Sequence, residues 1–254
     1  MSQSIKKQAL EFRKELGFSP IQTINFEYIC LMKNINLIYK EFHRDSFSGI
    51  GVKKNDENFI LINNAKAIGH QRYSIAHELY HLFFNKYNIV ICDISNLDQN
   101  LKEDERSAEI FAINFLVPDD GIRHYLRDEI LNIPNKTSLN EIIKLELIFK
   151  ISHYAMLIKL ENMNVITSNF KEELKYGIIK AAENLGFDTS LYKPSYDKRT
   201  KIISPYIPLA KKLHSEGKIS HGKYEELLRK VDKNFEDILK EEKLLEGMEK
   251  SIEL

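Results

Sequence analysis

Apolar residues recur at helical spacing along most of the chain, and a few short segments break that pattern. The helical spacing predicts helices over residues 4–16, 23–34, 67–86 and 103–116, and a further helix over 121–131. Three short apolar segments predict strands over residues 36–39, 49–52 and 59–62. Polar residues 55–58 suit a hairpin turn, so the last two strands are expected to pair antiparallel. The pattern therefore predicts an α+β fold that is mostly helical, with a small antiparallel sheet.

The rest of the chain is also helical in pattern. Residues 139–151 predict one helix, and Ser152 can cap a second one that follows at once. Further helices are predicted over residues 170–185, 207–215 and 220–239. The stretch 186–205 holds two prolines and indicates a subdomain boundary. Residues 236–249 are dense in Lys and Glu, which is typical of a solvated helix or a frayed tail.

Length and composition narrow the class of protein. The chain has 254 residues, of which 43% are hydrophobic, so it can bury the core of one large or two modest domains. It has no run of about 18 apolar residues that could cross a membrane, and its first residues predict a charged amphipathic helix instead of a signal peptide. Cys30 and Cys92 lie in apolar surroundings, as buried thiols do in a reducing compartment. We therefore expect a cytoplasmic protein without membrane contact.

The most informative segment is His77-Glu78-Leu79-Tyr80-His81, which falls inside the predicted helix over 67–86. Residues four apart share a face of a helix, so both imidazoles can bind one metal ion. Glu78 points about 100° round the helix, toward a water on that ion, and is the candidate general base. The buried side of the helix would consist of Ile75, Leu79 and Leu82. The alternative is a surface helix on which two histidines stand in i,i+4 contact.

The predicted helix over 103–116 offers an acidic side chain as a third metal ligand. Its apolar stripe consists of Ala108, Phe111, Ala112, Phe115 and Leu116. Asp104 and Glu105 continue that stripe, whereas Glu109 lies further round toward solvent. A buried carboxylate needs an ionic partner or a metal, and a catalytic zinc takes three protein ligands and a water. The helix dipole also favours acidic residues in a first turn. Helix geometry therefore does not decide whether Asp104 and Glu105 bind a metal or only stabilise the helix, or which of the two would be the ligand.

Residues 138–163 have helix-turn-helix spacing, but their side chains do not favour the reading of DNA. A reading helix exposes basic and amide groups, whereas the second helix here offers His153, Tyr154, Lys159 and Glu161 among apolar residues. The whole chain has 37 basic and 37 acidic residues, and its formal net charge of 0 gives no attraction to nucleic acid. We therefore expect a packed helical pair that serves packing or protein contacts, with weak DNA binding at most.

Taken in order, these segments resemble the ImmA/IrrE family of metallopeptidases. The similar parts are the run 71–81, the pattern Glu105-x-x-Ala108-x-x-Phe111-Ala112 and its end at 115–118. Upstream, residues 48–50 and 60–64 resemble the two short strands that precede the zinc helix in that family. The resemblance covers about residues 20–165, and the combination is more specific than any one of its segments.

The resemblance implies a zincin-like core in which His77, His81 and Glu105 hold Zn²⁺, and it selects Glu105 over Asp104. Glu78 is then the catalytic base of a zinc metallopeptidase of the gluzincin type. The implied domains are a metallopeptidase domain over residues 1–165, with the helix-turn-helix-like segment at 138–163, and a helical C-terminal extension over 166–254. Members of the family act on, or are encoded beside, helix-turn-helix repressors. The implied function is cleavage of such a repressor, which relieves repression of stress or mobile-element genes.

Two positions depart from the family pattern. Residues 115–118 read Phe-Leu-Val-Pro in place of Leu-Leu-Met-Pro, which keeps the apolar character, whereas Tyr80 stands where the family has Gly. The phenol of Tyr80 is a candidate for a hydrogen bond to a transition state, as are His70 and His124, which are close in sequence to the two candidate metal-binding helices. Two other functions stay open. One is a regulator that binds a repressor or DNA without proteolysis, and the other is a component of a toxin–antitoxin pair.

Overall fold

The computed structural model describes residues 2–43, 47–54, 57–85, 89–91, 99–195 and 200–231. The chain divides into two compact units, Met1–Lys201 and Ile202–Leu254. The division falls inside the stretch 186–205, where the two prolines indicate a boundary. The implied division between residues 165 and 166 is a different one, and it stays a prediction.

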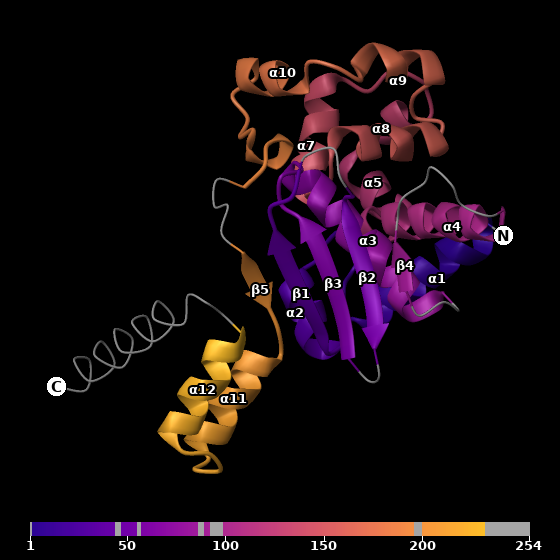
Figure 1. Cartoon of the computed structure of the whole chain (residues 1–254). Helices are drawn as coiled ribbons and strands as arrows, with labels where there is room; N and C mark the ends of the chain where they lie inside the picture. The colour runs from indigo at the N-terminus through magenta and orange to yellow at the C-terminus, as the bar shows by residue number, and fades with distance from the viewer. Residues whose placement is uncertain are drawn as a thin grey trace. The chain divides into compact units, whose positions relative to one another are not determined.

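Helices dominate both units, as Figure 1 shows. The helices of the first unit are α1 (Ser2–Glu15), α2 (Phe26–Met32), α3 (Ile68–Phe84), α4 (Gln99–Leu116), α5 (Asp119–Tyr125), α6 (Asp128–Leu131), α7 (Leu139–Phe149), α8 (His153–Asn162), α9 (Ser168–Leu174), α10 (Ile178–Asn184) and the 3-10 turn η2 (Ser190–Tyr192). The strands are β1 (Ile35–Lys40), β2 (Gly49–Lys54), β3 (Glu57–Asn63), β4 (Ile89–Ile91) and β5 (Lys201–Ile203), the last of which begins at the end of the first unit. The second unit contains α11 (Tyr206–Ser215) and α12 (His221–Val231).

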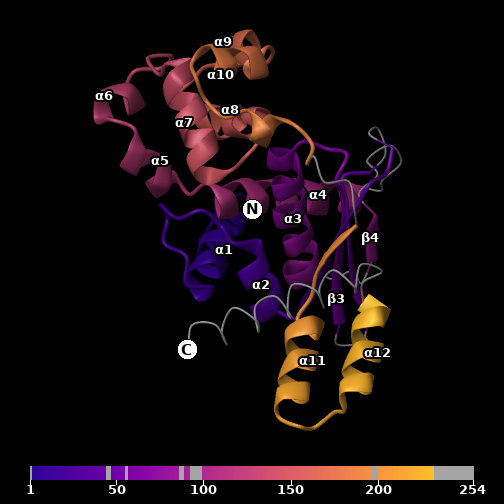
Figure 2. The same cartoon turned by 90° about the vertical axis from the view of Figure 1, so that its left-hand side faces the viewer.

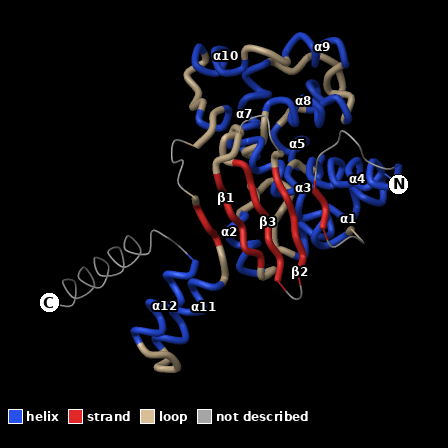
Figure 3. The backbone as a smooth tube through the Cα atoms, viewed as in Figure 1, coloured by secondary structure: helices blue, strands red, loops and turns tan. Residues whose placement is uncertain are grey.

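The sheet of the first unit is mixed, with strands in the order β4-β2-β3-β1 (Figure 3). As expected, β2 and β3 are antiparallel, with Gly51 opposite Ile60. However, β1 and β3 are parallel, with Leu37 opposite Ile60, so the expectation of a wholly antiparallel sheet was wrong. The reason is the order of the strands in the sheet: β1 and β2 are not neighbours, because β3 lies between them. β2 runs opposite to β1, so β3, which is antiparallel to β2, runs in the same direction as β1. The α+β class is confirmed. Residues 55 and 56 of the expected turn lie outside the described residues.

Helix α3 covers one face of this sheet (Figure 2). It contacts β2 and β3 on one side and α4 on another. Ile75, Leu79 and Leu82 are all buried, which confirms the predicted orientation of the helix. Each such side chain stabilises the packed state by about 1.5–3 kcal/mol when fully buried. This packing fixes the direction in which the polar side chains of α3 point.

Aromatic side chains join α1, α3 and α4 on the other side of α3. The predicted stripe of α4, namely Ala108, Phe111, Ala112, Phe115 and Leu116, is fully buried, with no member more than 1% exposed. Phe12 of α1 stands among four phenylalanines, its ring centroid 5.3 Å from that of Phe84 and 5.7 Å from that of Phe115. Aromatic pairs at such spacings add to the gain from burial. The cluster therefore holds α3 and α4 at a fixed separation.

The pair α7 and α8 packs as a helical hairpin, and Ser152 caps α8 through its side chain, as predicted. The turn before Ser152 approaches the first turn of α3 at backbone distance. A Cβ atom at Gly69 would lie 2.7 Å from the backbone N of Ser152 and 2.9 Å from its Cα. The next residue back, Ile68, donates its N–H to the carbonyl of Lys193 at 3.0 Å. The hairpin and the chain after η2 therefore fix the N-terminal end of α3.

The second unit, as far as it is described, is a helical hairpin. Ala210 of α11 packs with Tyr224 and Leu228 of α12. The Lys- and Glu-rich segment 236–249 and the predicted buried thiol of Cys92 lie outside the described residues, whereas Cys30 is buried as expected. Among the described helices of both units, none has the length and apolar character that a membrane crossing requires.

We predict that Gly69→Ala lowers the free energy of unfolding by about 1–3 kcal/mol, because its added methyl group meets backbone that cannot turn aside. Gly222→Ala on α12 is the matched control, since nothing lies within 4 Å of the methyl group added there. The control should leave stability unchanged or raise it by up to about 1 kcal/mol. Urea unfolding measures both variants, and equal stability of the two would contradict the close contact of α3 with α8.

Candidate metal centre

Three polar side chains from two helices meet where α3 contacts α4. Nε2 of His77 lies 3.0 Å from Oε2 of Glu105, and Nε2 of His81 lies 3.3 Å from Oε1 of the same carboxylate. The two Nε2 atoms are 3.1 Å apart. All three residues are buried. Within the part of the chain that the structure describes, no other set of three or more His, Cys, Asp or Glu side chains gathers in this way.

These separations fit a tetrahedral metal ion. Zinc binds His nitrogen and carboxylate oxygen at about 2.0–2.2 Å, and tetrahedral angles then place neighbouring ligand atoms about 3.3 Å apart. The separation of 3.1 Å between the two Nε2 atoms is close to that value. The imidazoles contact different oxygens of Glu105, at 3.0 and 3.3 Å, and one ligand atom from each of the three residues lies within 4.8 Å of the others. Three protein ligands also leave one tetrahedral position for water or substrate. The residues present therefore fit a divalent metal ion such as zinc.

The structure brings Glu105, and not Asp104, to the two imidazoles. Glu105 is buried in the cluster, whereas Asp104 is only half-buried and its charge acts on Tyr80. Glu109 is exposed, as the helix pattern predicts. The distinction between Asp104 and Glu105 comes from the angle at which α4 crosses α3, which helix geometry alone does not give.

The electrostatics of the cluster favour a cation. Burial opposes the ionisation of Glu105, but hydrogen bonds from His77 and His81 hold the pKa of its carboxyl well below the usual value. Burial also opposes protonation of His77, yet the nearby carboxylates of Glu105, Glu78 and Glu109 raise the pKa of its imidazole. The site therefore stabilises positive charge between the imidazoles, which a divalent metal ion supplies.

Glu78 is almost fully buried and lies against strand β2. A Cβ atom at Gly49 would lie 3.2 Å from its Oε1, and a Cβ atom at Gly51 would lie 2.9 Å from its Oε2. These two glycines therefore provide the space that the carboxylate occupies. The charge of Glu78 also raises the pKa of the neighbouring imidazole of His77.

The sequence reading missed three residues that position the site. The side-chain amide of Asn85 lies 3.1 Å from Nδ1 of His81, on the side of the ring opposite Nε2. Its spacing of four residues from His81 on the same helix face is the signal that could have found it. Gly49 and Gly51 are two residues apart on β2, so they face the same side of the sheet. Their contact with Glu78 depends on how α3 packs against that side, which no local pattern in the sequence records.

The other three predicted residues lie outside the ligand cluster. Tyr80 is buried, hydrogen-bonded to Ser107, with its ring centroid 5.6 Å from that of Phe111, and burial raises the pKa of its phenol. His70 lies two turns before His77 on α3, with its Nε2 2.9 Å from Oγ of Ser48, and burial lowers the pKa of its imidazole. His124 is exposed on α5. A role of any of them at a transition state stays a prediction.

A comparison with family models finds one match, and it contains the whole ligand cluster. Residues 30–134 match the Peptidase_M78 family, described as the IrrE N-terminal-like domain. This match confirms the resemblance to the ImmA/IrrE metallopeptidases. It includes α3 and α4, and therefore His77, Glu78, His81 and Glu105. No curated protein matches the chain.

We predict that the purified protein binds one zinc ion per chain. His77→Ala and His81→Ala should abolish stoichiometric binding, and Glu105→Gln should weaken it by more than about tenfold, because each removes a ligand. Asp104→Asn is the matched control for Glu105→Gln and should keep the wild-type zinc content. Elemental analysis after dialysis measures all four variants. Equal zinc content in Glu105→Gln and Asp104→Asn would contradict the assignment of the third ligand.

Proposed function

We propose that the Peptidase_M78 domain at residues 30–134 is a zinc-dependent endopeptidase that cleaves a helix-turn-helix transcriptional repressor. The observation that carries this proposal is the meeting of His77, His81 and Glu105 at one point, with Glu78 buried beside them. Two histidines and a glutamate are the ligand set of a gluzincin-type site. Cleavage of a repressor would relieve repression of its genes, and it would place the reaction in the cytoplasm.

His77, His81 and Glu105 would hold the zinc ion, which would supply Lewis acidity to activate a water and polarise a peptide carbonyl. Glu78 accepts the proton of the attacking water and then donates it to the amine that leaves. The carboxylate can do both because the helix α3 and the strand β2 hold it from two sides.

Asn85 has a positioning role in this proposal. When Nε2 of His81 is a metal ligand, Nδ1 carries the ring proton and needs an acceptor. The atom that lies 3.1 Å from Nδ1 is the amide nitrogen Nδ2 of Asn85, so the amide has to turn by 180° before its oxygen can accept the ring proton. In that turned orientation Asn85 would select the tautomer of His81 that binds zinc.

The burial of the basic groups of α8 supports a protein substrate over DNA. Lys159 is 2% exposed and pairs with Asp119. His153 is also buried, with its Nδ1 2.6 Å from Oε1 of Glu146. These are the basic residues of the helix that would read DNA in a helix-turn-helix. Because both point inward, α8 offers little to a phosphate backbone, and the family resemblance supports a repressor protein as the partner.

We predict that Glu78→Gln keeps the zinc content and abolishes cleavage, because the amide has the shape of the carboxylate but cannot accept the proton. Removal of a general base typically costs about 10²–10⁴ in rate. Co-expression with helix-turn-helix proteins encoded beside the gene, followed by gel analysis, measures the cleavage.

Two outcomes would contradict the proposed function. Cleavage by Glu78→Gln at the wild-type rate would exclude Glu78 as the base. A repressor that the wild-type protein inactivates without cutting, and that Glu78→Gln inactivates equally well, would establish a non-proteolytic regulator or a toxin–antitoxin component instead.

We also predict that Gly51→Ala lowers the cleavage rate by about tenfold to a hundredfold while the protein stays folded and keeps its zinc. The added methyl group would lie 2.9 Å from Oε2 of Glu78, and the end of a flexible side chain gives way more easily than backbone. A displacement of about 1 Å in a catalytic group can cost about 10² in rate. Thermal unfolding, zinc analysis and a cleavage assay separate these effects, with Gly222→Ala as control. Wild-type cleavage by Gly51→Ala would show that Glu78 does not need the space above β2.

A further inference from the structure

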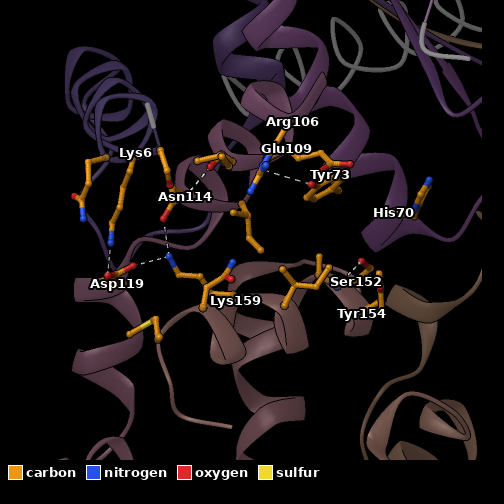
Figure 4. A pocket seen from close by; sticks show the side chains of 18 residues that line it. Lys6, His70, Tyr73, Arg106, Glu109, Asn114, Asp119, Ser152, Tyr154 and Lys159 are labelled. Carbon is orange, nitrogen blue, oxygen red and sulfur yellow. Dashed lines mark hydrogen bonds and ion pairs between the residues drawn. The ribbon is translucent and has the colours of Figure 1, made fainter. Parts of the chain in front are cut away.

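Helices α1, α3, α4 and α8 line a cavity of about 850 Å³ inside the first unit (Figure 4). Its volume is in the range of pockets that hold a small ligand or a few residues of a peptide. The proposed reaction does not use any of the residues that line it. The cavity therefore needs an explanation of its own.

The cavity begins one helical turn from the metal ligands. Tyr73 lines it and lies four residues before His77 on α3, and Glu109 lines it and lies four residues after Glu105 on α4. Residues four apart lie on the same helix face, so the cavity continues the face that carries the ligands. Tyr73 also donates a hydrogen bond to the carbonyl of Glu109 at 3.4 Å, so α3 and α4 contact one another at this end.

The far end of the cavity carries an excess of positive charge. Nζ of Lys159 donates hydrogen bonds to Oδ1 of Asn114 at 2.8 Å and to Oδ1 of Asp119 at 2.6 Å. Lys6 pairs with the other oxygen of Asp119. Two ammonium groups thus share one carboxylate, as Figure 4 shows on the side away from His70.

The buried ammonium of Lys159 has capacity for one more acceptor. An ammonium group has three N–H donors, and Asn114 and Asp119 accept two of them. Lys159 is 2% exposed, and burial lowers its pKa to about 8. An anion inside the cavity would stabilise its charged form, because opposite charges interact strongly where water is excluded.

Between its two ends the cavity is apolar. Ile110 and Ile113 of α4 line one wall, and Ala155 and Ile158 of α8 line the other. These walls lie between the end of the cavity at Glu109 and the end at Lys159. The lining therefore favours an apolar residue followed by an acidic one.

We propose that this cavity binds the substrate chain on one side of the scissile bond and holds an acidic side chain at Lys159. The inference rests on the proposed function, since it assigns a substrate class to that same site. The occupant is a peptide segment of the cleaved protein, with an apolar side chain between the isoleucines and a carboxylate that accepts the remaining proton of Lys159. Arg106, which also lines the cavity, adds a further positive charge.

Helix geometry gives the position of the acidic residue. Asn114, the partner of Lys159, lies nine residues after Glu105 on α4, which is about 13–14 Å along the helix axis. An extended peptide covers about 3.3–3.4 Å per residue. The acidic residue is therefore expected about three to five residues from the scissile bond, on one side only.

The alternative is that Lys159 serves only to tie α8 to α4 and α5. The two roles predict different selectivity for substrates. A structural tie predicts no preference for acidic substrates, whereas a substrate pocket predicts a preference that depends on the charge of Lys159.

The test is the cleavage of a proteome-derived peptide library by the zinc-loaded wild-type protein, with the cleavage sites read by mass spectrometry. We expect Asp or Glu to be enriched at one position three to five residues from the cut bond. A cleaved peptide from this set and its Asp→Asn or Glu→Gln analogue are then compared, and kcat/KM should fall by about tenfold to a hundredfold in the analogue.

Lys159→Met keeps the unbranched shape of the side chain, one atom shorter, and removes its charge, so it should cleave both peptides of the pair at similar rates. Lys171→Met is the matched control, because Lys171 pairs with Glu161 and does not line the cavity, and it should keep the wild-type ratio. Cleavage without acidic enrichment, or a ratio unchanged in folded Lys159→Met, would overturn the pocket while the proposed function stands. If Lys159→Met does not fold, the enrichment measured on the wild-type protein still decides. A zinc-loaded wild-type protein that cuts no peptide would overturn the proposed function and this inference with it.

Discussion

The rest of this structure depends on one constraint: three polar side chains are buried where α3 meets α4, and the free-energy cost of burying them has to be offset. A carboxylate and two imidazoles in a dry interior cost several kcal/mol unless charge and hydrogen bonds balance them. The protein offsets this cost because the carboxylate of Glu105 lies within hydrogen-bond or ion-pair distance of the imidazoles of both His77 and His81. The helices cannot relax away from one another, because the aromatic cluster around Phe12 and the close approach at Gly69 hold them in place. The metal site is therefore preorganised by packing that lies outside it.

In the proposed function, the same two helices would also connect catalysis with recognition. On α4, Glu105 lies at the ligand cluster, Glu109 one turn further at the near end of the cavity, and Asn114 at its far end. Because all of these side chains stand on rigid helices, a substrate bound in the cavity would be aligned with the metal site by the helix axis itself. In this proposal, substrate recognition would need few loops, and the selectivity would rest on buried charge.

The sequence predicted much of the fold and of the site, and the remainder depended on contacts between distant segments. The stripe on α4 and the face of α3 follow from helical periodicity, which a single segment contains, and the motif gives the spacing of His77 and His81. The parallel pairing of β1 with β3 depends on the route of the chain around the sheet, which no local pattern records. The burial of Lys159 on α8 follows from no local pattern, because its partners are Asp119, forty residues earlier, and Asn114. Gly51 was missed for the same kind of reason, since its role exists only beside Glu78. Asn85 is a local contact, four residues after His81, that the sequence could have indicated.

The most direct test of the proposed metal centre is a crystal structure of the zinc-loaded protein with anomalous scattering data recorded at the zinc absorption edge. We expect a single strong anomalous peak about 2.0–2.2 Å from Nε2 of His77, Nε2 of His81 and one carboxylate oxygen of Glu105, with a fourth position open to solvent. A peak bound by Asp104, a peak away from α3, or no peak in a zinc-loaded crystal would contradict it.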